Sequence, residues 1–162
     1  MSAAFTPWAR AAVVTAVVVG LDQGTKALVR AHVAVGSEDG VFPGVQLVHV
    51  RNDGVAFGAF AGGGAVVAAV IGVALMALLA YFATHLGRPL VWLPTGMLLG
   101  GALGNIIDRL RLGAVTDFIK LPAWPAFNVA DMSITFGVLV LLYVIESPPT
   151  PPAHRDGTRS DA

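Results

Sequence analysis

Two aspartates in the C-terminal half of the chain, Asp117 and Asp131, are the strongest candidates for chemistry. They lie in a segment, Gly100 to Asp131, that is dense in ionisable and amide side chains and stands between two long apolar runs. Two carboxylates held close together cannot both ionise easily, so one of them keeps a proton. Such a pair can activate water with its charged member and protonate a leaving group with the other. The pair is therefore a candidate for acid–base hydrolysis.

A structural role competes with this hypothesis at both positions. Asn128 is placed to cap a helix, and Asp131, three residues later, is placed to complete the cap, an arrangement that contributes about 1 kcal/mol. Asp117 is expected in a loop, where it can be an ordinary solvated acid. The spacing alone leaves catalysis and structure both open.

Other polar residues near the apolar runs have similar alternatives. Asp22 and Lys26 are four apart, as in an ordinary helix ion pair, and Lys26 also suits an extended position toward lipid headgroups. Asn105 and Arg109 are four apart as well. We expect Arg109 to pair with Asp108 or Asp22 and brace the helices, in preference to binding a headgroup or a substrate carbonyl.

The composition indicates the kind of protein that must position these residues. Of 162 residues, 56% are hydrophobic and 12% are charged, against about 25% charged in an ordinary soluble domain. The formal net charge is zero, and no basic block indicates nucleic acid. Cysteine is absent, which excludes disulfides and thiolate chemistry, and the four histidines lack metal-ligand spacing. We expect a membrane protein without a metal or cofactor.

Four apolar segments have the length of membrane-spanning helices, at about 9–29, 61–83, 90–107 and 129–145. The first is interpreted as a retained helix because it ends in Asp22–Lys26 without a small-residue cleavage site. Residues 31–60 are punctuated by Gly and Pro, which predicts short strands and turns outside the hydrocarbon. The fold class is thus all-α, a four-helix membrane bundle with a small β-rich insert. Residues 1–146 form one domain, and the Pro-rich tail 147–162 is expected to be disordered.

Four antiparallel crossings would bring the polar residues together. Both termini then lie on one side, whereas the exits of the first and third helices, the insert and the entry of the fourth lie on the other. The counts of Lys and Arg, four on the terminal side and six on the other, do not orient the bundle. Gly100, Gly101 and Gly104 predict close helix contact, since small residues admit tight packing in membranes.

Five short blocks of the sequence resemble the bacterial lipoprotein signal peptidases, the signal peptidase II family. The resemblance covers roughly residues 9–145 in the family's order, with a departure at Val55, where the family more often has Ala. The blocks are L-D-Q-G-T-K (Leu21 to Lys26), R-N-D-G-V-A-F-G (Arg51 to Gly58), G-G-A-L-G-N-I-I-D-R-L (Gly100 to Leu110), V-T-D-F-I (Val115 to Ile119) and F-N-V-A-D (Phe127 to Asp131).

This resemblance implies a membrane aspartyl peptidase of the bacterial inner membrane with both termini cytoplasmic and the insert as an extracytoplasmic cradle. Such enzymes remove the signal peptide from diacylglyceryl-modified prolipoproteins, just before the lipidated cysteine. Membrane lipid is an expected partner, and a monomer is the expected state. By motif the catalytic pair is Asp117 and Asp131. The positions implied to shape the site or contact ligand are Asp22, Lys26, Asn52, Gly54, Asn105, Asp108, Arg109, Asn128 and Ala130.

A different class of function is a small proton- or ion-coupled carrier that uses Asp22, Arg109 and Asp131 as a relay. A relay predicts polar residues deep in the bilayer on more than one helix. The second apolar segment has none. A purely structural scaffold would leave the paired acids without a role.

Overall fold

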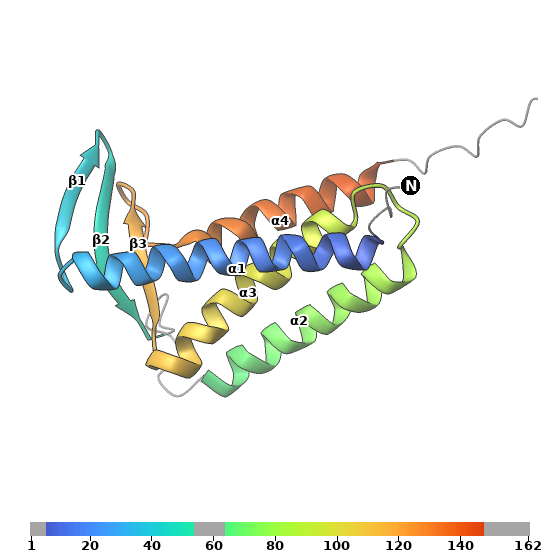
Figure 1. The fold of residues 1–162 in the computed structure, drawn as a ribbon, viewed down its shortest axis with the longest axis horizontal. Helices are drawn as coiled ribbons and strands as arrows, with labels where there is room; N and C mark the ends of the chain where they lie inside the picture. Colours follow the sequence, from blue (N-terminus) through green and yellow to red (C-terminus); the bar gives the residue numbers. More distant parts are fainter. Residues whose placement is uncertain (1–5, 54–63, 148–162) are drawn as a thin grey trace, which may run out of the picture.

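The computed structural model describes residues 6–53 and 64–147, and it consists of four helices with a small sheet at one end (Figure 1). The predicted Gly54 position and most of the Pro-rich tail lie outside the described residues. The first helix begins, and the fourth ends, at the end of the bundle away from the sheet. The elements are α1 (Pro7–His32), β1 (Glu38–Phe42), β2 (Val45–Asn52), α2 (Gly64–Thr84), α3 (Trp92–Leu112), β3 (Val115–Lys120) and α4 (Val129–Glu146).

Helix α3 lies against both α1 and α4, and glycines make this close approach possible. A Cβ added to Gly100 would lie 2.7 Å from the Cβ of Val18 on α1. A Cβ added to Gly101 would lie 2.5 Å from the carbonyl oxygen of Ala130 on α4. Any larger residue at these positions must push the helices apart, so the predicted role of these glycines in close helix contact is confirmed.

The helix ends follow local signals. Helix α1 begins at Pro7, where the Thr6 side chain accepts a hydrogen bond from the amide of Ala9. Helix α3 ends at Leu112, and the next residue, Gly113, has a positive φ of 75° that lets its amide donate to the carbonyl of Arg109. Helix α3 therefore extends past the predicted end at residue 107, and its residues beyond that point include Asp108, Arg109 and Arg111.

The sheet has three antiparallel strands in the order β1–β2–β3. Strands β1 and β2 lie within the predicted insert, whereas β3 lies between α3 and α4. In the register of β2 with β3, Val50 lies opposite Asp117 and Arg51 opposite Thr116. The prediction of a loop at Asp117 is therefore wrong. Its strand forms because the partner strand, distant in sequence, supplies the backbone hydrogen bonds that a short isolated segment lacks.

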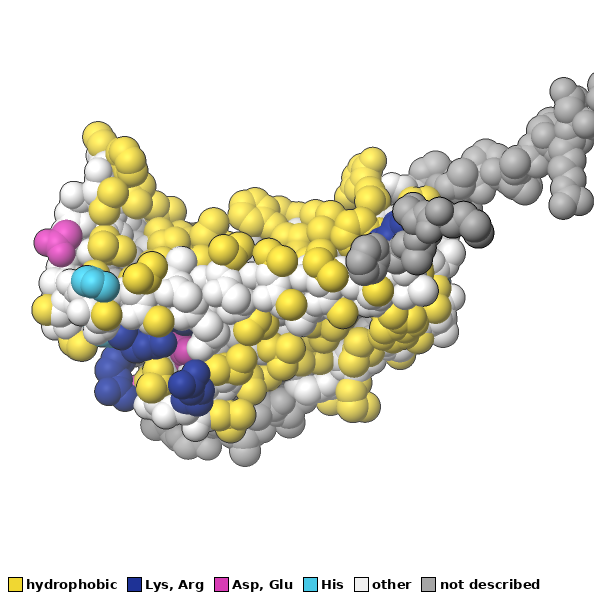
Figure 2. Space-filling view, in the orientation of Figure 1, with side chains coloured by type: hydrophobic (Ala, Val, Ile, Leu, Met, Phe, Trp, Pro, Cys, Tyr) yellow, Lys and Arg dark blue, Asp and Glu magenta, His cyan; other side chains and the backbone are white. Residues whose placement is uncertain are grey.

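The helices present apolar side chains outward and bury polar ones. Val17, Val73 and Leu139 are 54%, 67% and 56% exposed, whereas Asp22 and Lys26 are fully buried. On the face of the bundle that Figure 2 shows, hydrophobic side chains are spread along the helices. Two described helices, α1 and α4, are long and apolar enough to span a membrane, and α2 contributes the shorter apolar stretch Gly72–Thr84. Four crossings stay a prediction.

Candidate active site

The sheet end of the bundle gathers the polar residues that the sequence singled out. Asp117 comes from β3 and Asp131 from the first turn of α4. The other members come from α1, β2 and α3, so five elements converge on one region (Figure 1). The described residues in contact through hydrogen bonds or ion pairs are Asp22, Lys26, Asn52, Asn105, Asp108, Asp117, Asn128, Ala130 and Asp131.

Asp117 is 2% exposed, and amide groups hold both of its carboxylate oxygens. Asn128 Nδ2 donates to Oδ1 at 2.7 Å, and Asn52 Nδ2 donates to Oδ2 at 2.9 Å. Asn52 reaches it because side chains alternate along a strand, so Asn52 and Val50, which lies opposite Asp117, share one face of β2. The pairing of β2 with β3 therefore fixes the orientation of this carboxylate.

Asp131 completes the predicted helix cap. Its amide donates to Asn128 Oδ1 at 3.0 Å, and its own Oδ2 accepts from the amide of Asn128 at 3.2 Å, which is a capping box. The capping prediction is confirmed, but it accounts for only one carboxylate oxygen. The other, Oδ1, accepts from Asn105 Nδ2 at 2.8 Å. The structural role thus leaves this oxygen directed toward the polar cluster.

Amide side chains join the two aspartates through a directed chain of hydrogen bonds. Asn105 Oδ1 accepts from Lys26 Nζ at 2.9 Å and from Asn128 Nδ2 at 3.2 Å. Because its oxygen faces these donors, its NH₂ group is directed at Asp131. Asn128 likewise directs its NH₂ group at Asp117. Each aspartate therefore faces a donor whose orientation another residue fixes.

Lys26 neutralises two buried acids that hold the elements carrying the aspartates. Its ammonium lies 2.9 Å from Asp22 and 3.4 Å from Asp108, and all three side chains are at most 1% exposed. Asp22 Oδ1 accepts from the amide of Ala130, next to Asp131, at 2.9 Å. Asp108 Oδ2 accepts from the amide of Thr116, next to Asp117, at 3.0 Å. The alternative that Lys26 extends to headgroups is therefore wrong, because its position is the centre of this charge cluster.

Gln23 belongs to the same cluster and was missed from the sequence. Its Nε2 lies 3.1 Å from Asp22 Oδ2, Asp108 Oδ1 and the carbonyl of Gly104. It thus ties α1 to α3 beside the ion pairs. The only signal for it in the sequence was its place between Asp22 and Lys26, where no helix periodicity marks it as functional.

Among the described residues Arg109 pairs with neither Asp22 nor Asp108, contrary to the prediction that it braces the helices through one of them. Its side chain is exposed, and within the described residues its nearest polar contact is the carbonyl of Asn105 in its own helix, at 3.4 Å. Lys26 already occupies the position between Asp22 and Asp108, so neither acid is left for the guanidinium. Arg109 is instead accessible from outside at the sheet end.

The pKa of the Asp117 carboxyl is raised to about 6, chiefly because the group is buried and in addition because the negative charge of Asp131 lies nearby. The hydrogen bonds from Asn52 and Asn128 and the charge of Lys26 oppose this shift without cancelling it. A carboxyl with this pKa exchanges its proton near neutral pH, which is the property that acid–base chemistry requires.

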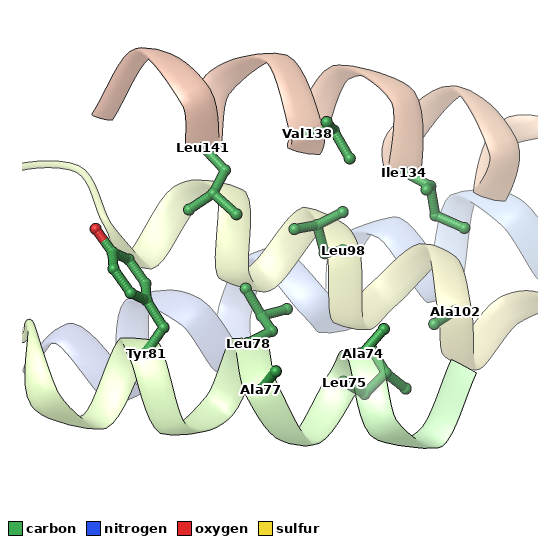
Figure 3. A pocket seen from close by; sticks show the side chains of 10 residues that line it. All are labelled: Ala74, Leu75, Ala77, Leu78, Tyr81, Leu98, Ala102, Ile134, Val138 and Leu141. Carbon is green, nitrogen blue, oxygen red and sulfur yellow. The ribbon is translucent and has the colours of Figure 1, made fainter. Parts of the chain in front are cut away.

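Two apolar hollows lie along the bundle, and one of them reaches the site. One of about 310 Å³ has Asp131 in its wall, together with Phe127, Met132 and Phe136. The other, about 480 Å³, lies between α2, α3 and α4, as Figure 3 shows. The Tyr81 hydroxyl in its wall is buried and has no hydrogen-bond partner among the described residues. The smaller hollow therefore gives an apolar group access to Asp131 from the side of the bundle.

The arrangement suits hydrolysis better than transport. Two carboxylates on separate elements are coupled through charge and through Asn128, whose side chain donates to Asp117 and whose backbone amide donates to Asp131. The pKa of Asp117 is raised to about 6. In the described residues, the buried charged groups gather at the sheet end and do not continue along the helices. The relay hypothesis through Asp22, Arg109 and Asp131 gains no support from this geometry, since Arg109 faces outward.

Known proteins are similar to this chain over most of its length. A family model described as Signal peptidase (SPase) II matches residues 14–146. A lipoprotein signal peptidase of Moorella thermoacetica is 47% identical over 104 residues, 64% of this chain and 69% of the relative. One of Halothermothrix orenii is 38% identical over 134 residues, 82% and 92% of the two chains. A solved structure described as a bacterial membrane enzyme matches with a TM-score of 0.74 and 29% identity, covering 85% of this chain and 92% of that chain.

Proposed function

This chain belongs to the signal peptidase II family of proteases, and from this premise we propose that it processes lipoproteins with an aspartate pair. It removes the signal peptide from diacylglyceryl-modified prolipoproteins by cleaving just before the lipidated cysteine. Asp117 and Asp131 act on the water that attacks the peptide bond. The observation that carries this proposal is that one residue, Asn128, binds both carboxylates. Its side chain donates to Asp117, and its backbone amide donates to Asp131.

The surroundings of the two carboxylates favour different roles. Asp131 lies in the first turn of α4, where the helix dipole and two N–H donors stabilise negative charge. Asp117 has its pKa raised by burial, and a bound substrate that excludes water would raise it further. We therefore assign Asp131 as the base and Asp117 as the acid.

The steps follow from this assignment. Asp131 takes a proton from water as the water oxygen attacks the carbonyl carbon of the scissile bond. Asp117 donates its proton to the carbonyl oxygen. The tetrahedral species then collapses as Asp131 gives the proton it took from water to the leaving peptide nitrogen and Asp117 takes back a hydroxyl proton. The products are a signal peptide with a free carboxylate and a mature protein whose N-terminus is the lipidated cysteine.

The supporting residues hold the pair in place and do not react. Lys26, Asp22 and Asp108 anchor the backbone beside each aspartate, while Asn52, Asn105 and Asn128 orient the carboxylates. Ala130 contributes the amide that Asp22 binds, and its small side chain is fully buried beside Gly104. Gly54 is proposed from the family motif alone. Arg109, exposed at the same end, is available to the substrate.

The proposed membrane arrangement has four crossings, with both termini cytoplasmic and the sheet at the extracytoplasmic surface. It is supported by the apolar outer surface of the helices and by the position of the polar cluster at one end only. Residues 1–146 act as one domain and as a monomer. In this arrangement the aspartates lie at the depth where a signal segment leaves the bilayer.

Lipid recognition is the part of the proposal that a substrate comparison tests. The apolar hollow of about 310 Å³ beside Asp131 offers room for acyl chains close to the scissile bond. Lipidated and unlipidated forms of one precursor are reconstituted into the same bilayers at equal surface density, and cleavage is followed by mass spectrometry. We expect the unlipidated form to be cleaved negligibly. Equal rates would mean that the enzyme reads the signal segment and not the diacylglyceryl group.

A further inference from the structure

The sheet has two faces, and the face opposite Asp117 carries a second group of polar side chains. Arg51 and Thr116 lie opposite each other in the β2–β3 register, one residue away from the pair Val50 and Asp117. Because side chains alternate along strands, they point away from the active-site face. With the ends of α1 and α3 they enclose a hollow of about 230 Å³. Its polar lining comes from Arg30, His49, Arg51 and Thr116, with Val35 and Leu112 beside them.

Two guanidinium groups give this hollow a positive charge. Arg30 Nη1 donates to Thr116 Oγ1 at 3.2 Å, and Arg51 Nη2 donates to the carbonyl of Leu112 at 3.1 Å. A guanidinium has five N–H donors, so within the described residues these contacts leave most donors of both groups for a ligand. Figure 2 shows Lys and Arg side chains gathered at this end of the bundle.

The nearest acid does not cancel this charge. Asp108 Oδ1 lies 3.8 Å from Arg30, but Asp108 is 1% exposed and already serves three other groups, of which Gln23 donates to this same oxygen. Its Oδ2 lies 3.4 Å from the Lys26 ammonium and accepts from the amide of Thr116. The carboxylate therefore lies behind Arg30, in the interior cluster, and does not face a ligand in the hollow.

Helix capping does not account for the convergence of the two arginines. Cations near helix C-termini are favourable, and both α1 and α3 end here. Each end is already closed by its own backbone, through the amide of Val33 on α1 and the amide of Gly113 on α3. Arg51 comes from a strand and is not part of either helix.

The rim and size of the hollow indicate what it takes. Val35 and Leu112, which line the hollow beside the charged groups, are 66% and 42% exposed. Exposed apolar side chains beside arginines are typical of the membrane–water interface, where basic groups meet anionic headgroups. Pockets for small molecules usually measure about 300–1,000 Å³, so this one suits a single compact group and not a peptide.

We propose that this hollow binds the phosphate group of an anionic phospholipid from the surrounding bilayer. Arginine is suited to phosphate because its planar donors meet two oxygens at once. The site is separate from the cleavage site, but it shares β3 with it, since Thr116 precedes Asp117. The proposal relies on the membrane arrangement given above and not on the hydrolytic mechanism.

The test uses the full-length protein in neutral detergent, titrated with short-chain phosphatidylglycerol while thermal unfolding is followed. The matched variants are Arg51→Gln and Arg111→Gln, two exposed arginines of which only Arg51 lines the hollow. We expect saturable stabilisation by phosphatidylglycerol and none by short-chain phosphatidylcholine. Binding should weaken about tenfold in Arg51→Gln and stay close to that of the unaltered protein in Arg111→Gln. If Arg51→Gln itself lowers the unfolding temperature, native mass spectrometry compares lipid binding in the two variants directly, because it counts the lipid molecules that each protein retains.

Three results would overturn the proposal. Equal weakening in both variants would mean diffuse attraction between charges. Equal stabilisation by phosphatidylcholine would mean that acyl chains alone bind. Saturation by inorganic phosphate at the same concentration as by phosphatidylglycerol would assign the site to free phosphate and not to lipid. Because no arm measures cleavage, a failure here is distinguishable from a failure of the proposed peptidase function.

Discussion

Replacing Lys26 by Met removes the one ammonium at the centre of the interior charge cluster. Met is similar in length and apolar, so the change deletes the charge and leaves the packing volume nearly intact. It leaves Asp22 without its ion-pair partner at 2.9 Å, and Asp108 with only Arg30 at 3.8 Å. Both carboxylates stay almost completely buried.

The magnitude follows from the burial of these acids. Removing one partner of a buried ion pair costs about 3–5 kcal/mol, a large part of the roughly 5–15 kcal/mol that stabilises a typical protein. For a chain of this size, 1 kcal/mol shifts the unfolding temperature by about 2–4 °C. Lys26→Met should therefore lower it by roughly 6–20 °C. Activity should fall as well, because Asn105 loses the donor that fixes its orientation toward Asp131.

Thermal unfolding in one detergent, with two further variants, isolates the charge effect. Lys26→Met combined with Asp22→Asn should recover part of the loss, since the amide oxygen can still accept from the amide of Ala130. Lys120→Met breaks the surface pair with Glu38 and should cost under about 1 kcal/mol. The reasoning fails if Lys26→Met melts like the unaltered protein, or if adding Asp22→Asn makes it less stable still.

Three further expectations concern single positions. Because burial raises the pKa of Asp117 from its ordinary 3.8 to about 6, the folded state binds that proton more tightly than the unfolded chain. The free energy of unfolding should fall by about 3 kcal/mol as the pH rises through this interval. Unfolding measured at pH 4 and at pH 7 checks this, and the difference should be absent in Asp117→Asn. Arg109→Ala should change the unfolding free energy by under about 0.5 kcal/mol, yet raise KM for the lipidated precursor; a large loss of stability would restore the bracing role. Gly101→Val should destabilise the protein by at least about 1–3 kcal/mol, because its Cβ would meet the carbonyl of Ala130. Gly72→Val, which meets nothing within 4 Å, is the control and should melt near the unaltered protein.

Local patterns in the sequence were enough to predict several parts of the site. The spacing of Asn128 and Asp131 gave the helix cap, because a capping box involves only neighbouring backbone groups. The glycines of α3 gave the close helix contacts, since small residues are needed wherever backbones approach. Antiparallel connectivity was enough to predict that the polar groups lie at one end of the bundle. It did not predict the distances between them.

Distant partners explain what local patterns missed. The strand around Asp117 depends on pairing with β2, whose residues precede it by more than sixty positions. Lys26 is buried because Asp108 on α3 joins Asp22 around it, and a pair at i and i+4 says nothing about a third charge. Arg109 was assigned to that same acid pair and is exposed because Lys26 already occupies the position. Each error concerns the choice among partners, which only the packed structure decides.

Cleavage of a lipidated precursor by Asp117→Asn and Asp131→Asn tests the aspartate pair most directly. Both amides can still accept hydrogen bonds, so both variants should stay folded, as unfolding temperatures will show. An amide cannot exchange the proton that the reaction needs, so turnover should fall by roughly 10²–10⁴-fold in each. Asp39→Asn, an exposed acid on β1, should cleave normally. Near-normal turnover in a folded Asp117→Asn or Asp131→Asn variant would contradict the account and leave that residue with a structural role alone.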